Sequence, residues 1–146
     1  MLYRSNILFN SIKVSRSLYA YSIRNMISTV SRMNVQQFAT IIMDDAKRVN
    51  YQIIDVREPN ELQIAQIAGK DVINLPLSRS DDWAPEVLNG NLLDAKKPTC
   101  ILCHHGRRSM QMAMFLTHEA SFSDVANIEG GIDSYSMLVD ASIQRY

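Results

Sequence analysis

The stretch Thr99-Cys-Ile-Leu-Cys-His-His-Gly-Arg-Arg-Ser109 joins a short apolar run to a basic loop. Residues 99–103 have the length and composition of a buried strand, and residues 109–119 have apolar side chains at helical spacing. Few residues separate the two segments, and the thiol of Cys103 stands where the strand ends. The sequence therefore places a nucleophilic side chain on a tight connection that leads into a helix.

The start of a helix is a favourable place for an anion. Unpaired backbone N–H groups and the helix dipole both stabilise negative charge there. A thiolate or persulfide at Cys103 would be held in these surroundings, and the charges of Arg107 and Arg108 would add to the effect. Gly106 allows the backbone to curl, and Ser109 is expected to cap the helix. The loop would thus supply both a nucleophile and an anion pocket.

Helical and strand-like segments alternate along the chain from residue 34. Helices are expected over 35–47, 61–67, 109–119 and 134–143, and strands over 51–56, 71–77, 99–103 and 124–128, with helix and loop over 78–98. This order predicts an α/β fold, a three-layer sandwich whose central sheet has four to five mostly parallel strands and helices on both faces. Sites in such sheets lie at the carboxyl ends of strands, where Cys103 falls.

Four motifs, in family order, resemble the rhodanese family of sulfurtransferases. The first motif, Cys103-His-His-Gly-Arg-Arg-Ser109, is similar to the active-site loop C-x-x-G-x-R-S of that family. The other three are Asp55-Val-Arg-Glu-Pro-Asn-Glu61, Asn74-Leu-Pro76 and Gly130-Gly-Ile-Asp133. The resemblance covers residues 35–140. It implies a rhodanese-like fold and an enzyme of the thiosulfate sulfurtransferase type. Such an enzyme moves a sulfane sulfur from thiosulfate or a related persulfide donor to a thiophilic acceptor through a Cys103 persulfide, with no cofactor and no metal.

The same resemblance implies roles for individual residues. Cys103 would be catalytic, and the substrate would be bound by His104, His105, Gly106, Arg107 and Arg108, with backbone amides around the sulfur. Arg108 would also stabilise the loop, whereas Asp55 and Arg57 would be structural. The chain departs from the family pattern at Ala65-Gln-Ile-Ala-Gly-Lys70, which lacks the usual Gly and His, at Tyr135, where Trp is common, and at Ala120-Ser121, which replaces a Gly.

Two other types of site use similar residues. Cys100 and Cys103 have the spacing of a redox pair, but three residues of extended strand span about 10 Å. A disulfide needs Cα atoms about 4.4–6.8 Å apart, so Cys100 is expected to be a core residue. Zinc could be held by both cysteines with His104 and His105, but structural zinc sites usually combine separated pairs. Adjacent histidines on a tight loop are also expected to point apart.

Two other functions remain as alternatives. The phosphatase relatives of this fold use a loop one residue longer, and the shorter loop here should fit a single sulfur better than a phosphate. A non-catalytic interaction or regulatory module would keep the fold without the chemistry. Retention of Cys103, Gly106 and Arg108 favours the enzyme.

The expected partners are a small-molecule sulfur donor and a cyanide or thiol acceptor, with glutathione and thioredoxin as candidates. Neither nucleic acid nor a membrane is expected as a partner, and the protein is expected to be a monomer.

The N-terminal segment differs in charge from the rest of the chain. Residues 1–43 contain five Arg and Lys and no acid, so they carry net +5 and the remainder carries net −5. A basic, serine-bearing leader is typical of an organelle transit peptide. We therefore expect residues 1–33 to be a leader and residues 34–146 to be the domain. The expected location is mitochondrial, with plastid or cytoplasm as alternatives. With only two cysteines, no disulfide framework is expected.

Overall fold

The computed structural model describes residues 30–146. Residues 1–29 of the predicted leader therefore lie outside the described residues. The described chain contains one sheet of five strands in the order β1-β5-β4-β2-β3, and every neighbouring pair is parallel. The strands are β1 (Ser31–Met33), β2 (Gln52–Asp55), β3 (Ile73–Asn74), β4 (Thr99–Leu102) and β5 (Val125–Ile128). The predicted α/β architecture is confirmed.

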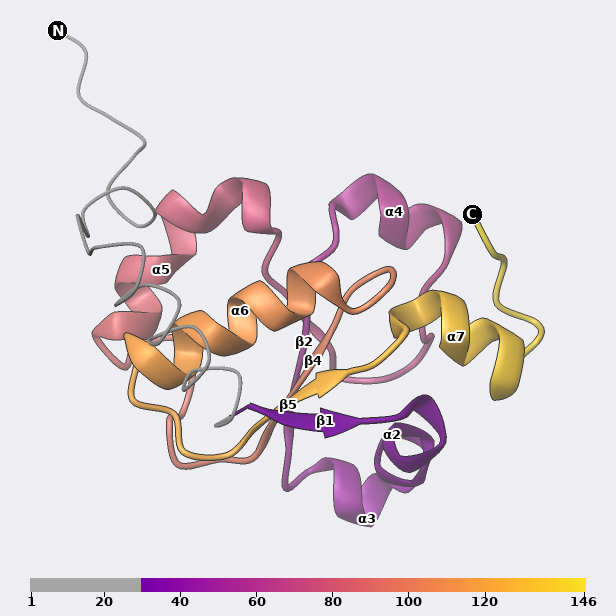
Figure 1. The fold of residues 1–146 in the computed structure, drawn as a ribbon, viewed down its shortest axis with the longest axis horizontal. Coiled ribbons are helices and arrows are strands. Elements are labelled where there is room, and N and C mark those ends of the chain that lie inside the picture. The colour runs from indigo at the N-terminus through magenta and orange to yellow at the C-terminus, as the bar shows by residue number, and fades with distance from the viewer. Residues whose placement is uncertain (1–29) are drawn as a thin grey trace, which may run out of the picture.

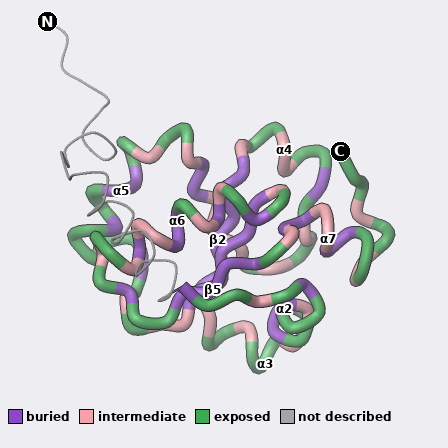
Figure 2. Tube along the Cα trace, viewed as in Figure 1, coloured by how far each residue is buried: buried purple, intermediate pink, exposed green. Residues whose placement is uncertain are grey.

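Helices cover both faces of this sheet. They are α2 (Val35–Ile42), α3 (Asp45–Arg48), α4 (Pro59–Ile64), α5 (Ser80–Leu88), α6 (Arg107–His118) and α7 (Gly131–Leu138), with a short 3-10 helix at Leu77–Arg79. Figure 1 shows α5 and α6 on one side of the sheet and α2 with α7 on the other. Buried positions concentrate along the strands and on the helix sides that face them, as Figure 2 shows.

Alternation along the strands sends neighbouring side chains to opposite faces. In the β4 region, Ile101 and Cys103 join the core beneath α5 and α6. Cys100 and Leu102 join the core beneath α2 and α7. The two cysteines therefore belong to different layers, and both are free thiols. Cys100 is a core residue, as predicted, and it is neither a redox partner of Cys103 nor placed to share a zinc ion with it.

The sequence predicted that the domain starts at residue 34, but strand β1 lies before that residue, at Ser31–Met33. It pairs with β5 in parallel register from Ser31 opposite Ala126. The Ser31 hydroxyl also donates to the Val125 carbonyl at 3.0 Å. The sheet therefore takes its edge strand from the last residues assigned to the leader. A strand of three residues is too short to show a period of two, which explains why the sequence pattern missed it.

Several predicted segments have different boundaries in the structure. The helix predicted over 61–67 lies at Pro59–Ile64, and the chain is already extended at Ala65. The helix predicted over 35–47 is divided into α2 and α3, because the Asp44 carboxylate accepts from the backbone N–H groups of Ala46 and Lys47 and starts a new helix. The strand predicted over 71–77 is reduced to Ile73–Asn74. The last helix begins at Gly131 rather than at residue 134.

Candidate active site

The thiol of Cys103 lies at the carboxyl end of β4, on the short loop before α6. Its sulfur accepts a hydrogen bond from the Gly106 N–H at 3.0 Å and another from the Ser109 hydroxyl at 3.2 Å. Cys103 is 1% exposed and Ser109 is fully buried. Two donors therefore converge on one sulfur, and negative charge on that sulfur would strengthen both bonds.

Ser109 is not the helix cap that the sequence predicted. Helix α6 starts two residues earlier, at Arg107, and its N-cap is Gly106, whose φ is +94°. In this left-handed conformation the chain turns sharply enough to bring the Gly106 N–H back toward the sulfur. Ser109 consequently lies in the first turn of α6, where its hydroxyl reaches Cys103 rather than the helix backbone.

The loop rests on the turn that follows β5. The backbone N–H of Ile132 donates to the Cys103 carbonyl at 2.9 Å, and the Asn127 side-chain amide donates to the Gly106 carbonyl at 3.1 Å. A Cβ at Gly131 would lie 2.3 Å from the Cys103 carbonyl oxygen, so only glycine fits there. The Gly130-Gly131 motif thus allows the close approach that supports the active-site loop from behind.

Arg108 ties the start of α6 to α4. Its guanidinium donates to both carboxylate oxygens of Glu61, at 2.6 and 2.7 Å, which is the bidentate geometry of a strong ion pair. The hydrogen bond from Arg108 is the main reason why the pKa of Glu61 falls from 4.5 to about 2. The carboxylate therefore stays ionised at neutral pH, and Arg108 is held at the edge of the loop.

A second arginine lies entirely inside the domain. Arg57 is fully buried and donates to the carboxylate of Asp55, with the shortest distance 2.7 Å. It also donates to the Ala65 carbonyl at 2.8 Å and to the Tyr146 hydroxyl at 3.0 Å. These contacts join β2 to the segment after α4 and to the C-terminal segment. They agree with the structural role that the motif resemblance implied for Asp55 and Arg57.

The two histidines of the loop do not point apart, so that prediction was wrong. The rings of His104 and His105 lie with centroids 3.8 Å apart, and the other face of His104 stacks on Tyr146 at 4.0 Å with an interplanar angle of 11°. Burial lowers the pKa of His104, which keeps this imidazole neutral at neutral pH. Its Nε2 atom is buried without a hydrogen-bond partner among the described residues.

A metal ion does not fit this cluster well. Ligand atoms of His104, His105 and Asp133 lie within 4.8 Å of one another. However, Arg145 donates to both carboxylate oxygens of Asp133, at 2.8 and 3.2 Å. The His105 Nε2 atom also lies 3.9 Å from the nearer Asp133 oxygen, and Asp133 is already occupied by Arg145. Tetrahedral binding needs donors that converge.

Next to the loop lies an open groove of about 400 Å³ with a basic side. It is lined by Arg32, His105, Gly106, Arg107, Met110, Asn127, Glu129 and Gly130. His105 and Arg107 are exposed, and Arg107 makes no ion pair within residues 30–146. An anionic molecule that approaches the loop from this groove would therefore meet an available guanidinium.

Comparison with known proteins gives the same family as the motifs. Residues 36–138 match the Rhodanese-like domain. The chain belongs to the rhodanese-like family. An Arabidopsis thaliana relative, "Rhodanese-like/PpiC domain-containing protein 12, chloroplastic", is 44% identical over 106 residues, which are 73% of this chain and 32% of that protein.

More distant relatives of this rhodanese-like domain include sulfurtransferases. "Adenylyltransferase and sulfurtransferase UBA4" of Debaryomyces hansenii is 25% identical over 130 residues, 84% of this chain and 27% of that protein. The chain therefore spans about a third or less of the curated relatives it matches. A thiosulfate sulfurtransferase structure from Pseudomonas aeruginosa superposes with a TM-score of 0.60 over 84% of this chain and 21% of that one. At 17% identity, that likeness shows the fold alone.

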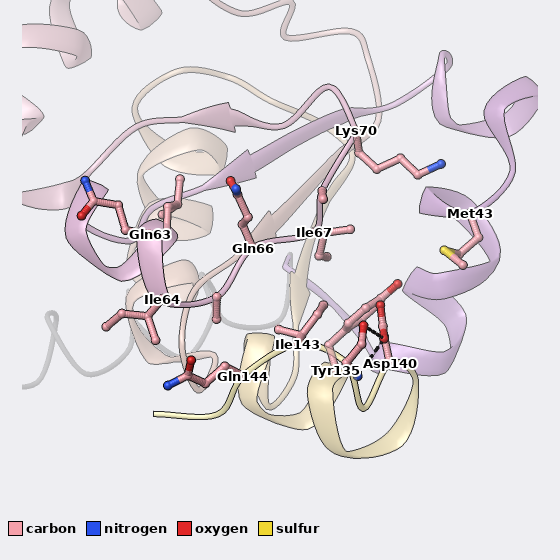
Figure 3. A pocket seen from close by; sticks show the side chains of 14 residues that line it. Met43, Gln63, Ile64, Gln66, Ile67, Lys70, Tyr135, Asp140, Ile143 and Gln144 are labelled. Carbon is pink, nitrogen blue, oxygen red and sulfur yellow. Dashed lines mark hydrogen bonds between the residues drawn. The ribbon is translucent and has the colours of Figure 1, made fainter.

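A separate cavity of about 660 Å³ lies between the segment after α4 and the C-terminal segment (Figure 3). Its labelled side chains are mostly apolar or amide-bearing, and the Lys70 ammonium group at one side pairs with Asp45 at 3.3 Å. None of the predicted site residues lines this cavity. This cavity is therefore separate from the loop that carries Cys103.

Sequence reasoning missed two side chains that contact the site. Ser109 was assigned to the helix cap, although it donates to the sulfur. Tyr146 was not singled out, although it contacts His104, Arg57 and Glu61. Glu61 was part of a quoted motif, but its pairing with Arg108 could not be foreseen from that motif. No local signal marks such contacts, since Tyr146 lies 85 residues from Glu61 in the chain.

Proposed function

We propose that this rhodanese-like domain is a sulfurtransferase in which Cys103 carries a sulfane sulfur as a persulfide. The observation that supports this most directly is the position of the Cys103 sulfur, which accepts from the Gly106 N–H at 3.0 Å and the Ser109 hydroxyl at 3.2 Å. Donors that are already in place can stabilise a thiolate before transfer and the terminal persulfide sulfur afterwards. A buried structural cysteine, such as Cys100, has no such donors among the described residues.

The first step takes sulfur from an anionic donor such as thiosulfate. The Cys103 thiolate attacks the outer sulfur of thiosulfate, the donor's S–S bond breaks, and sulfite leaves with the bonding electron pair. The product is a Cys103 persulfide anion. Its charge lies beside the N-terminus of α6, where the backbone N–H groups have no helical partners.

The second step returns the cysteine to its starting state. Cyanide or the thiolate of an acceptor attacks the terminal sulfur, and the bond between the two sulfurs breaks. Thiocyanate or a new persulfide is formed, and the electron pair returns to Cys103 as its thiolate. No net oxidation or reduction is needed, so sulfur transfer requires no redox cofactor. Glutathione and thioredoxin are the cellular acceptors we propose.

The groove beside the loop favours a negatively charged donor. Exposed Arg107 and His105 line it, and both adjoin the loop that carries Cys103. Replacing Arg107 by Glu should therefore raise the KM for thiosulfate with a smaller effect on kcat, because the charge acts in binding rather than on the transferred sulfur. Steady-state assays with thiosulfate and with glutathione persulfide would measure how far the effect depends on the donor.

The test of the proposed function is turnover from thiosulfate to cyanide by the full chain. Cys103→Ser should abolish turnover, whereas Cys100→Ser should keep it, because Cys100 lies in the core on the other side of the sheet. A folded wild-type protein that is inactive with thiosulfate and with glutathione persulfide would reject the enzyme. That result would favour the interaction or regulatory module.

We also propose that the basic N-terminal segment directs the chain to an organelle. The sequence predicted mitochondrial targeting with the plastid as an alternative. The 44% identical Arabidopsis relative is named chloroplastic, which supports the plastid. Fusing residues 1–33 to a fluorescent protein tests this location. Diffuse cytoplasmic fluorescence would reject targeting by this segment.

A further inference from the structure

The C-terminal segment returns to the active-site loop after α7. Figure 1 shows it running from α7 back toward α4. Arg145 holds this segment through Asp133, to which its Nε donates at 2.8 Å. The next residue, Tyr146, then lies with its ring on His104, at a centroid distance of 4.0 Å and nearly parallel. One face of the residue next to the catalytic thiol is therefore covered by this tyrosine.

The hydroxyl of Tyr146 connects two ion pairs. It accepts from Arg57 Nη1 at 3.0 Å and donates to Glu61 Oε1 at 2.9 Å. Arg57 is the buried partner of Asp55, and Glu61 is the bidentate partner of Arg108. The Tyr146 hydroxyl thus joins the buried Arg57 to Glu61, the carboxylate that holds Arg108. Hydrogen bonds to charged groups are the stronger ones, so this connection restrains both sides.

Removal of the hydroxyl would break these two hydrogen bonds and leave the other hydrogen bonds of Arg57 and Glu61 intact. Arg57 would keep Asp55 and its bond to the Ala65 carbonyl, and Glu61 would keep both bonds to Arg108. Tyr146 is itself 38% exposed, so little core packing depends on it. Substitution should therefore affect the position of the loop much more than the stability of the fold.

We propose that Tyr146 is a positioning residue for sulfur transfer. Its hydroxyl fixes Glu61 and thereby the Arg108 side of the loop, while its ring fixes His104 on the Cys103 side. Together these contacts set the positions of the two donors to the sulfur, the Gly106 N–H and the Ser109 hydroxyl. The inference rests on the proposed sulfurtransferase function of Cys103. It assigns to Tyr146 no contact with the reacting atoms.

Two variants separate the contributions of the hydroxyl and the ring. Tyr146→Phe keeps the stack on His104 and removes the bridge, whereas Tyr146→Ala removes both. Tyr51→Phe is the matched control, because Tyr51 packs against the core beneath α2 and α7, and its hydroxyl makes no hydrogen bond among the described residues. Each full-length protein is loaded with sulfur from thiosulfate, and the persulfide content is measured by intact mass. Discharge to cyanide is then followed in a single turnover.

The expected result is a graded loss in the rate of discharge per persulfide. Tyr146→Phe should slow discharge by about fivefold and Tyr146→Ala by roughly tenfold to a hundredfold, since small misplacements in an active site lower the chemical rate. The KM for thiosulfate and the midpoint of urea unfolding should stay near the wild-type values, as should every property of Tyr51→Phe. Wild-type discharge rates in both Tyr146 variants would overturn the proposal, as would a loss that follows only the fraction unfolded.

A measurement without sulfur keeps this inference separate from the proposed function. Hydrogen exchange of the amides of residues 104–108 reports on the loop whether or not the protein has activity. Exchange there should be about fivefold faster in Tyr146→Ala than in the wild type, and unchanged in Tyr51→Phe. If wild-type protein transfers no sulfur, the proposed function fails while exchange still decides the role of Tyr146. Equal exchange in wild type and Tyr146→Ala would reject that role.

Discussion

Replacing Glu61 by Gln should weaken the active-site loop and remove an acid-sensitive part of the domain's stability. Glu61 accepts two hydrogen bonds from Arg108, at 2.6 and 2.7 Å, and its side chain is 15% exposed. Gln has the same shape but no charge, and its amide group would place a donor against the guanidinium. The substitution therefore removes the ion pair and one of its two hydrogen bonds.

The size of the effect follows from the pKa of Glu61. Hydrogen bonding from Arg108, which outweighs the opposing effect of burial, lowers that pKa from 4.5 to about 2. This shift gives an upper bound of about 3 kcal/mol for the stabilisation by the ionised carboxylate. Because the Arg108 side chain is 33% exposed, solvent screens the pair. We therefore expect Glu61→Gln to lower the free energy of unfolding by about 1–2 kcal/mol near neutral pH.

The sign of the pH dependence follows from the direction of the shift. Since the folded pKa lies below the unfolded value, the stabilisation is complete above pH 4.5 and is lost as the pH falls toward about 2. Urea unfolding of wild type and Glu61→Gln across this pH range measures the difference between their free energies of unfolding. This difference should become smaller below pH 4.5. Glu119→Gln, at an exposed position just after α6, is the matched control. Equal stabilities near neutral pH, or a difference that does not change with pH, would show that the ionised Glu61 carboxylate does not stabilise the fold.

Two further predictions concern the loop and the two thiols. Gly106→Ala should lower the free energy of unfolding by about 1–3 kcal/mol and reduce turnover. Its φ is +94°, and an added Cβ would lie 3.2 Å from the Gly130 nitrogen. Gly90→Ala, with a φ of +72° and open space around it, should keep full activity, and equal losses in both variants would contradict the packing argument. Iodoacetamide near pH 8 should modify Cys103 alone in the folded protein, because burial and then Asp124 raise the pKa of Cys100 to about 12. Peptide mapping checks this, and labelling of Cys100 at the same rate would contradict it.

The loop that carries Cys103 could be predicted from the sequence because its features are local. The apolar run 99–103 predicted the strand that is β4. The glycine and two arginines that follow Cys103 predicted a thiol just before the N-terminus of a helix. The structure places these residues at the carboxyl end of β4, as expected. Alternating segments likewise gave the parallel sheet with helices on both faces, because strand and helix periods are properties of short stretches.

Other features depend on conformation or on distant contacts. The N-cap of α6 is set by the left-handed φ of Gly106, so Ser109 moved from the expected cap to the sulfur. Strand β1 becomes visible only through its pairing with β5. The place of Tyr146 follows from how the chain returns after α7 and not from any residue near it. Such contacts have no periodic or motif signal in a single sequence.

The most direct test of sulfur transfer through Cys103 follows one sulfur atom on that residue. Full-length protein is incubated with thiosulfate, desalted to remove the donor, and weighed as an intact chain before and after cyanide is added. We expect a mass gain of one sulfur on wild type and Cys100→Ser and none on Cys103→Ser. Cyanide should then remove that sulfur, with one thiocyanate formed for each sulfur lost. Two results would contradict a Cys103 persulfide. One is a folded wild-type protein that gains no sulfur from thiosulfate or glutathione persulfide, and the other is an equal gain on wild type and Cys103→Ser.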